Sequence, residues 1–179
     1  MFTDAHRATG LPLWVQDYPN STGVHIEVES LLEVLARVAT IRGVKCEAAP
    51  TFLRIRRLAA ERPDLLLLSG LGGSNLIEDL VAGARGVASG ISRPRALVEA
   101  ASAWAAEDLV GARTALGAIA GLVGIETQAG TSIAIRKEHW RRRGVIASAD
   151  VRPSQLPYPS FLSEISEELG YPLGTTGAG

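Results

Sequence analysis

The sequence has a single cysteine, Cys46, and only two lysines among its 179 residues. One cysteine cannot form an internal disulfide, which excludes a disulfide-held secreted domain and leads us to expect a reducing, cytoplasmic compartment. The chain also lacks a run of about 18 apolar residues, and its first residues lack the apolar core of a signal peptide. We therefore predict no membrane contact.

An excess of charge of one sign is also absent, because the formal net charge is -1. The composition therefore indicates no attraction to nucleic acid. The basic run over residues 136–143 is interpreted as a solvated or intersubunit face, since it is one turn of like charge in a near-neutral chain. His6, His25 and His139 are too scattered for a metal site, and no cofactor is expected.

What the sequence does contain is an alternation of apolar strand-like and amphipathic helix-like segments. With 46% hydrophobic residues, the chain is long enough for one domain with a real core. Four strand-helix units in strict alternation predict a parallel sheet with right-handed crossovers. The predicted strands cover residues 13–18, 43–48, 65–70 and 86–90, and the predicted helices 30–40, 52–62, 75–82 and 94–107.

From residue 109 the pattern predicts helices only. One of them is marked by Leu116, Ile119, Ala120 and Val123, and two more are expected over residues 133–143 and 161–169. Residues 171–179 are rich in Gly and Thr, and this composition predicts a disordered tail. A short helix that ends at Gly10 is expected at the start of the chain, followed by a loop at residues 19–23 after the first strand.

Lys45 stands between Val44 and Cys46 in an apolar predicted strand. A lysine can lose its proton when it is buried and then act as an amine nucleophile, which an arginine cannot do. The alternative is a lysine at a strand end whose amine reaches water. The residue types leave both interpretations open.

Four segments occur in an order that resembles the dihydrodipicolinate synthase and N-acetylneuraminate lyase family. They are residues 13–18 followed by Pro19 and Thr22-Gly23, then Gly43-Val44-Lys45, residues 67–70 and residues 86–89. Members of that family are (β/α)8 barrels with a helical C-terminal extension. They act on pyruvate or related keto acids through a Schiff-base lysine on the sixth strand.

The resemblance covers about residues 8–170 and implies an α/β fold, a partial (β/α)8 TIM barrel. Residues 1–108 would supply strands 5 to 8, and residues 109–170 the C-terminal helical extension. It also implies a lyase or aldolase-type enzyme in which Lys45 forms a Schiff base with a 2-keto acid for C–C bond cleavage, C–C bond formation or dehydration. The expected partners are a small keto acid substrate and further copies of the chain in a homo-oligomer.

A full barrel needs about 250 residues, so strands 1 to 4 of the family are not in this chain. The family's paired-threonine segment, which holds the substrate carboxylate, is missing with them. Either the sequence is truncated, which we expect, or it is a half-barrel that folds with a partner. Two further alternatives stay open: a non-catalytic fragment or assembly module, and an independent α/β binding domain.

The chain departs from the family around its first predicted strand. The family pattern Y-N-x-P-x-R-T-G reads Gln16-Asp17-Tyr18-Pro19-Asn20-Ser21-Thr22-Gly23 here. The resemblance puts Gln16 in place of the proton-relay tyrosine, and Ser21 in place of an arginine that binds the second substrate of the synthases. Because side chains alternate along a strand, Gln16 and Tyr18 share a face, and Tyr18 is predicted to supply the missing hydroxyl.

The same alternation turns Lys45 and Glu47 toward the barrel axis, about 7 Å apart along the strand, and turns Cys46 toward the outer helices as a core residue. Glu47 is predicted to pair with the lysine or to act as an acid or base; the alternative is a glutamate that faces water. The remaining candidates for the substrate pocket are Gln16, Thr22, Gly70, Ala88 and Ser89, which the resemblance places along it.

Overall fold

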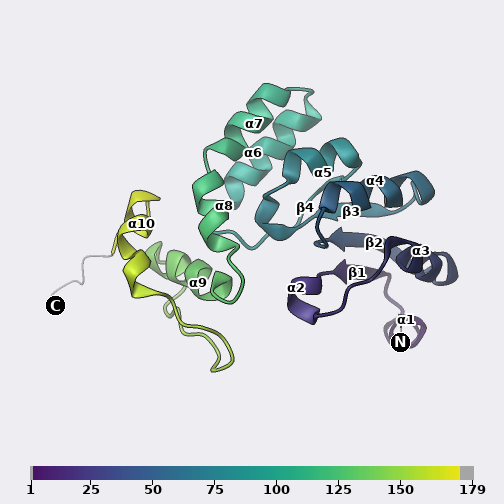
Figure 1. Ribbon diagram of the computed structural model, residues 1–179, viewed down its shortest axis with the longest axis horizontal. Helices are drawn as coiled ribbons and strands as arrows, with labels where there is room; N and C mark the ends of the chain where they lie inside the picture. Colours follow the sequence, from purple (N-terminus) through teal and green to yellow (C-terminus); the bar gives the residue numbers. More distant parts are fainter. Residues whose placement is uncertain (1, 174–179) are drawn as a thin grey trace.

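The computed structural model describes residues 2–173 (Figure 1). The strands are β1 (Leu13–Asp17), β2 (Ile41–Cys46), β3 (Leu66–Ser69) and β4 (Gly86–Val87). The helices are α1 (Phe2–Thr9), α2 (Pro19–Thr22), α3 (Val28–Arg37), α4 (Thr51–Glu61), α5 (Leu76–Ala82), α6 (Pro94–Ala105), α7 (Leu109–Gly117), α8 (Ala120–Glu126), α9 (Ser132–Arg142) and α10 (Ser163–Glu168), with short 3-10 turns η1 (Leu71–Gly73) and η2 (Ser160–Leu162).

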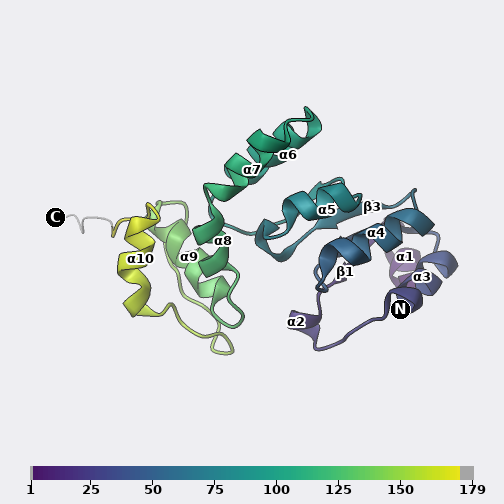
Figure 2. The ribbon, with the colours of Figure 1, turned by 45° about the horizontal axis from the view of Figure 1, so that its top comes forward.

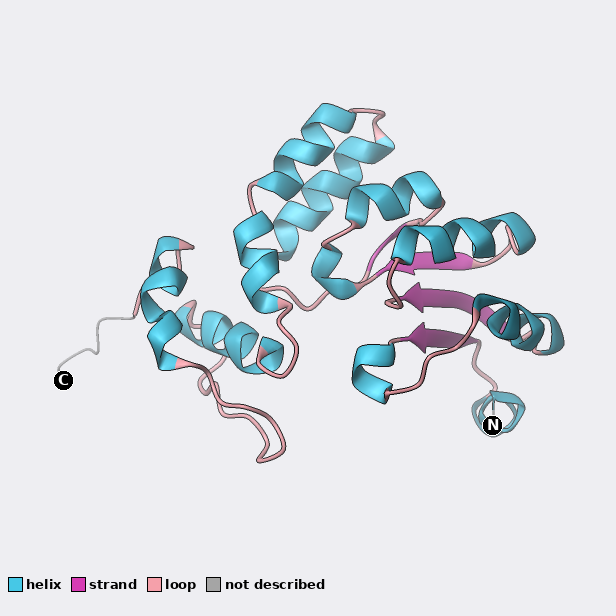
Figure 3. Ribbon diagram, in the orientation of Figure 1, coloured by secondary structure: helices cyan, strands magenta, loops and turns pink. Residues whose placement is uncertain are grey.

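The four strands form one parallel sheet in the order β1-β2-β3-β4, as the alternation predicts. Figure 3 shows the longer strands as arrows that point the same way, so their carboxyl ends meet at one edge. The pairing aligns Gln16 with Lys45, Lys45 with Leu68, and Leu68 with Gly86. These four residues form one row across the sheet.

One face of the sheet is covered by helices and the other is open. Val15, Val44 and Leu67 are buried against the apolar sides of α3, α4 and α5. On the opposite face the side chains of Trp14 and Leu66 remain 43% exposed. Parallel sheets are normally covered on both faces, so this open face is unusual for the fold.

The helices after β4 form two groups. Figure 2 shows α6 and α7 side by side, projecting away from the sheet, with α8, α9 and α10 gathered beyond them. The predicted helix through Leu116 and Val123 is wrong: α7 ends at Gly117, and α8 begins at Ala120 after a bend of 53°. Gly117 and Gly121 weaken helix continuity, and the bend lets Ile119 reach the core.

Within residues 2–173, no single helix has the length and apolar composition needed to cross a membrane. The bent pair α7 and α8 meets those two criteria only when its members are taken together.

A buried polar network holds the C-terminal helices together. His139 on α9 contacts Glu126 on α8 through Nδ1, at 2.5 Å, and Ser166 on α10 through Nε2, at 3.0 Å. Tyr171 stacks on the His139 ring, is fully buried, and shares a hydrogen bond of 2.6 Å with Ser92. The predicted disordered tail therefore starts too early, because Tyr171 belongs to the core. Residues 174–179 of that prediction lie outside the described residues.

Other differences from the predicted elements are small. The predicted loop at residues 19–23 contains the one-turn helix α2, which Pro19 starts and Gly23 ends with φ of 68°. The last strand, predicted over residues 86–90, is reduced to Gly86–Val87.

Asp79 on α5 anchors the helical layer to β3 and α4. Its carboxylate accepts hydrogen bonds from Ser69 Oγ, at 2.6 Å, and from Thr51 Oγ1, at 2.7 Å, and the residue is buried. Burial raises the pKa of Asp79 above its usual value of 3.8, and the two hydroxyl donors oppose this shift. The folded protein therefore holds this proton more tightly than the unfolded chain does.

We predict that Asp79→Asn reduces a pH dependence of stability. A pKa raised by folding contributes stability that is present below pH 3.8 and lost as pH rises through the folded value. Urea unfolding from pH 3.8 upward should show a smaller decline of the unfolding free energy in Asp79→Asn than in the wild type. The control is Asp64→Asn, which removes an exposed carboxyl whose pKa Arg62 lowers. For this variant, the pH dependence of the unfolding free energy should differ from that of the wild type at acid pH instead. Parallel profiles for Asp79→Asn and wild type would contradict the assignment.

Candidate functional site

Lys45 and Glu47 lie together at the carboxyl end of β2, on the open face of the sheet. Lys45 Nζ is 3.2 Å from Glu47 Oε2, and the two side chains are 25% and 6% exposed. The predicted pairing of Glu47 with the lysine is confirmed, and the alternative of a glutamate that faces water is wrong. A mostly buried amine beside a buried carboxylate is an arrangement suited to proton transfer.

Glu47 has a hydrogen-bond donor on each carboxylate oxygen. Gln16 Nε2 donates to Oε2 at 2.6 Å, and the backbone N–H of Leu71 donates to Oε1 at 3.1 Å. The Glu47 N–H itself donates to the Asp17 carbonyl at 2.9 Å, which continues the ladder between β1 and β2. Leu71 adopts a positive φ of 46°, unusual for a leucine. These contacts fix the carboxylate beside the amine.

Gly70 provides the space that the Glu47 side chain occupies. A Cβ at this position would lie 2.1 Å from Glu47 Cγ and 2.6 Å from Glu47 Cδ. The glycine is therefore required by a close approach of two chain segments and not by its backbone angles. The structure thus puts Gly70, a predicted residue of the substrate pocket, directly against Glu47.

The other face of these strands is part of the core. Cys46 is fully buried, and burial, with a smaller contribution from the nearby Asp17 carboxylate, raises the pKa of its thiol to about 12. This confirms that Cys46 is a core residue. Asp17 is also buried, which raises its pKa, while its ion pair with Arg54 on α4 acts in the opposite direction.

Tyr18 and Thr22 lie in the turn after β1. Among the described residues none makes a hydrogen bond to the Tyr18 hydroxyl, and Thr22 Oγ1 donates to the Tyr18 carbonyl at 3.1 Å. Thr22 is exposed, so its observed contacts are those of a residue that closes α2. Nothing in the described contacts brings either side chain to Lys45.

Ala88 and Ser89 follow β4, two strands away from Lys45. The Ala88 N–H donates to the Ser69 carbonyl at 3.0 Å, and Ser89 Oγ accepts from the Ile91 N–H at 3.2 Å. Both residues are half-buried at the carboxyl end of the sheet. They line the same edge as Glu47 without contacting it.

One partner of Glu47, the backbone N–H of Leu71, is a functional group that the sequence pattern did not reveal. Gln16, which the resemblance places along the substrate pocket, donates instead to the Glu47 carboxylate. A glycine directly after β3, on the row of Glu47, was the available signal for a close approach. No group of three His, Cys, Asp or Glu side chains suited to a metal ion occurs within the described part of the chain.

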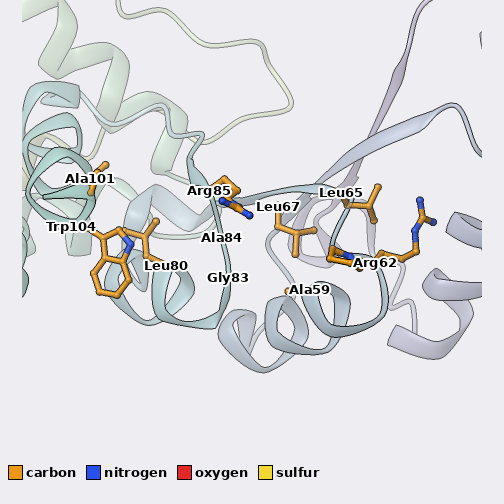
Figure 4. Close-up of a pocket in the computed structure, with 12 residues that line it drawn as sticks. Ala59, Arg62, Leu65, Leu67, Leu80, Gly83, Ala84, Arg85, Ala101 and Trp104 are labelled. Atoms are coloured by element: carbon orange, nitrogen blue, oxygen red, sulfur yellow. The ribbon is translucent and has the colours of Figure 1, made fainter. Parts of the chain in front are cut away.

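The cavity drawn in Figure 4 lies at the other end of the strands. It encloses about 460 Å³ between α4, α5 and α6, and its lining includes Leu65, Leu67, Arg85 and Trp104. Leu65 and Arg85 directly precede β3 and β4, so this cavity opens at the amino ends of the strands, away from Lys45. In open parallel α/β sheets, ligands bind at the carboxyl ends of the strands, which favours the Lys45 edge as the site.

Comparison with protein families assigns the chain. The model of the dihydrodipicolinate synthetase family matches residues 2–169. The chain belongs to this family.

Solved structures of family members share the fold. Dihydrodipicolinate synthase from Rhodopseudomonas palustris superposes with a TM-score of 0.86 at 24% identity, over 94% of this chain and 58% of its own. The synthase from Thermotoga maritima gives 0.81 at 22%, over 94% and 58%. YagE, a prophage protein of the dihydrodipicolinic acid synthase family from E. coli K12 solved in complex with pyruvate, gives 0.78 at 19%, over 95% and 60%. None of the curated protein sequences matches.

This member of the dihydrodipicolinate synthetase family therefore spans less than two thirds of the length of its structural relatives. Its parallel sheet and its helices correspond to part of their fold.

We predict that Gly70→Ala destabilises the protein by displacing Glu47. The new Cβ would overlap the Glu47 side chain, and such overpacking costs about 1–3 kcal/mol. Gly86→Ala is the matched control, because a Cβ on this neighbouring strand would lie at an ordinary 3.6 Å from Leu68 Cδ2. Equal unfolding free energies for the two variants in urea titrations would contradict the account.

Proposed function

We propose that the protein is a lyase of aldolase, dehydratase or synthase type, in which Lys45 forms a Schiff base with pyruvate or a related 2-keto acid. The observation that carries this proposal is the Lys45 amine itself, three-quarters buried beside a carboxylate at the carboxyl end of a parallel strand. Membership of the dihydrodipicolinate synthetase family supports it. The pyruvate bound in the E. coli prophage relative points to the substrate class.

The chemistry requires the lysine in its unprotonated form. Its nitrogen attacks the keto carbon, a C–N bond forms, and the keto oxygen leaves as water. The resulting protonated imine withdraws electrons from the adjacent carbon, which allows a C–C bond there to break or form, or water to leave. The partly enclosed position of Lys45 limits competition by bulk water.

We further propose that β1 to β4 act as strands 5 to 8 of a (β/α)8 barrel. The exposed Trp14 and Leu66 then become lining residues of the barrel interior, and the free edges of β1 and β4 pair with further strands. The greater length of the structural relatives supports this arrangement. In such a barrel the other strands complete the pocket above Lys45 and hold the substrate carboxylate.

The non-catalytic alternative has less support, because a scaffold gains nothing from an amine and a carboxylate kept together on an otherwise open face. A cytoplasmic location and assembly into a homo-oligomer stay predictions from the sequence.

Reductive trapping tests the proposed Schiff base. The full-length protein is incubated with pyruvate and borohydride, and peptide mapping by mass spectrometry locates the adduct. We expect the adduct on Lys45 and none in Lys45→Ala. Lys137→Ala is the matched control, because it removes the other lysine of the chain, whose amine donates to the Asp150 carbonyl and not to a residue near Lys45. An adduct that persists undiminished in Lys45→Ala, or wild-type protein that forms none, would overturn the proposal.

A further inference from the structure

We propose that Glu47 is the acid–base residue of the reaction, with Gln16 as the residue that positions it. This inference rests on the proposed function, because it assigns the proton transfers that accompany the Schiff base on Lys45. It is carried by the contacts of a single carboxylate: the Lys45 amine, the Gln16 amide and the Leu71 N–H.

Distance and burial make Glu47 competent for proton transfer. Its Oε2 is 3.2 Å from Lys45 Nζ, which is within the range for direct transfer to or from that nitrogen. Its side chain is 6% exposed, so little water competes for the proton. Glu47 also lies two residues closer than Lys45 to the carboxyl edge of the sheet, where a keto acid bound to the amine would extend.

The environment of Glu47 is built to hold the carboxylate in this one place. Gln16 lies directly across from Lys45 in the strand register, and its amide donates to the same Oε2 that faces the amine. The Leu71 N–H holds the other oxygen, and Gly70 leaves the volume free. Burial of a carboxylate is costly unless its charge is paired and its oxygens accept hydrogen bonds, and these contacts supply both.

The other candidates for proton transfer are less suited. Gln16 cannot ionise, and it acts here as a donor to Glu47. The Tyr18 hydroxyl makes no hydrogen bond to a described residue, while Glu47 already contacts the nitrogen that reacts. Cys46 points into the core with a pKa of about 12. Glu47 is therefore the titratable group that reaches Lys45.

The proton steps balance as follows. The carboxylate of Glu47 takes one proton from the ammonium of Lys45, which leaves a neutral amine and a neutral carboxylic acid. The amine adds to the keto carbon, and one of its N–H protons passes to the keto oxygen, which gives a carbinolamine. Glu47 then returns its proton to the carbinolamine hydroxyl, the C–O bond breaks and water leaves, so that a protonated imine forms and Glu47 is again a carboxylate. It then accepts a proton from the carbon next to the imine, and the electron pair of that C–H bond forms the enamine.

Exchange of the pyruvate methyl protons tests this last step directly. The full-length protein is mixed with pyruvate in D2O, and the loss of the pyruvate methyl signal is followed by proton NMR. We expect Glu47→Gln to slow the exchange by about 100-fold or more, whereas prolonged borohydride trapping still labels Lys45. Glu99→Gln, which changes an exposed glutamate on α6, is the matched control and should exchange at the wild-type rate. Tyr18→Phe should exchange faster than Glu47→Gln.

Two additional variants separate chemistry from folding. Glu47→Asp keeps the charge but withdraws the carboxylate by one methylene, and we expect exchange to slow by about 10-fold or more. Gln16→Leu removes the donor to Glu47 Oε2. We expect this variant to exchange the methyl protons more slowly than the wild type and to show a shifted pH profile of the exchange rate, while trapping at Lys45 is retained. Thermal melting of each variant confirms that the compared proteins are folded.

The outcomes are distinguishable. Wild-type protein without an adduct on Lys45 overturns the proposed function. An adduct on Lys45 together with wild-type exchange rates in Glu47→Gln or Glu47→Asp overturns the role of Glu47 and leaves the proposed function standing. A loss of exchange in Tyr18→Phe that equals the loss in Glu47→Gln also contradicts the assignment, because it would make the tyrosine the proton carrier.

Discussion

The ion pair between Lys45 and Glu47 is the contact on which the rest of the site depends. Taking a carboxylate out of water is unfavourable unless its charge is paired and its oxygens accept hydrogen bonds. The chain meets this requirement locally, with the Gln16 amide, the Leu71 N–H and the empty volume at Gly70. Features that look unrelated along the sequence thus serve one side chain.

The parallel register of the sheet makes this contact possible. Because Gln16 pairs with Lys45, and Lys45 with Leu68, side chains from three strands meet on one face. The opposite face is filled by Val44, Leu67 and the helices. One sheet thus presents a chemical face and a packing face, and the chemical face is left open over the length that this family member spans.

Much of the fold could be predicted from the sequence. Apolar runs and amphipathic periods repeat four times, and each local pattern agrees with the parallel sheet that is observed. The shared face of Lys45 and Glu47 followed from the alternation of side chains along a strand, and the structure shows that they pair on it. Family membership followed from motifs in the right order, and the family model confirms it.

The contacts that could not be predicted join residues far apart in the chain. Asp79 meets Thr51 across 28 positions, and Gln16 meets Glu47 across 31. Such pairs depend on how a helix sits on the sheet and on where a loop returns, which no period in the sequence encodes. Tyr171 was misjudged for the same reason: a Gly-rich neighbourhood favours disorder, but stacking on His139 outweighs it.

The break between α7 and α8 shows a limit of another kind. Apolar spacing through residues 116–123 fits one helix, and the burial of Ile119 decides for two. Local propensity and tertiary packing disagreed there, and packing prevailed.

The central claim is that Lys45 reacts while Glu47 stays beside it. The most direct measurement is a crystal structure of the full-length protein after borohydride reduction in the presence of pyruvate. The account predicts a covalent bond from Lys45 Nζ to the former keto carbon, with the Glu47 carboxylate within hydrogen-bonding distance of that nitrogen and still bound by Gln16. An unmodified Lys45, or a Glu47 side chain turned away to solvent beside a modified one, would contradict it.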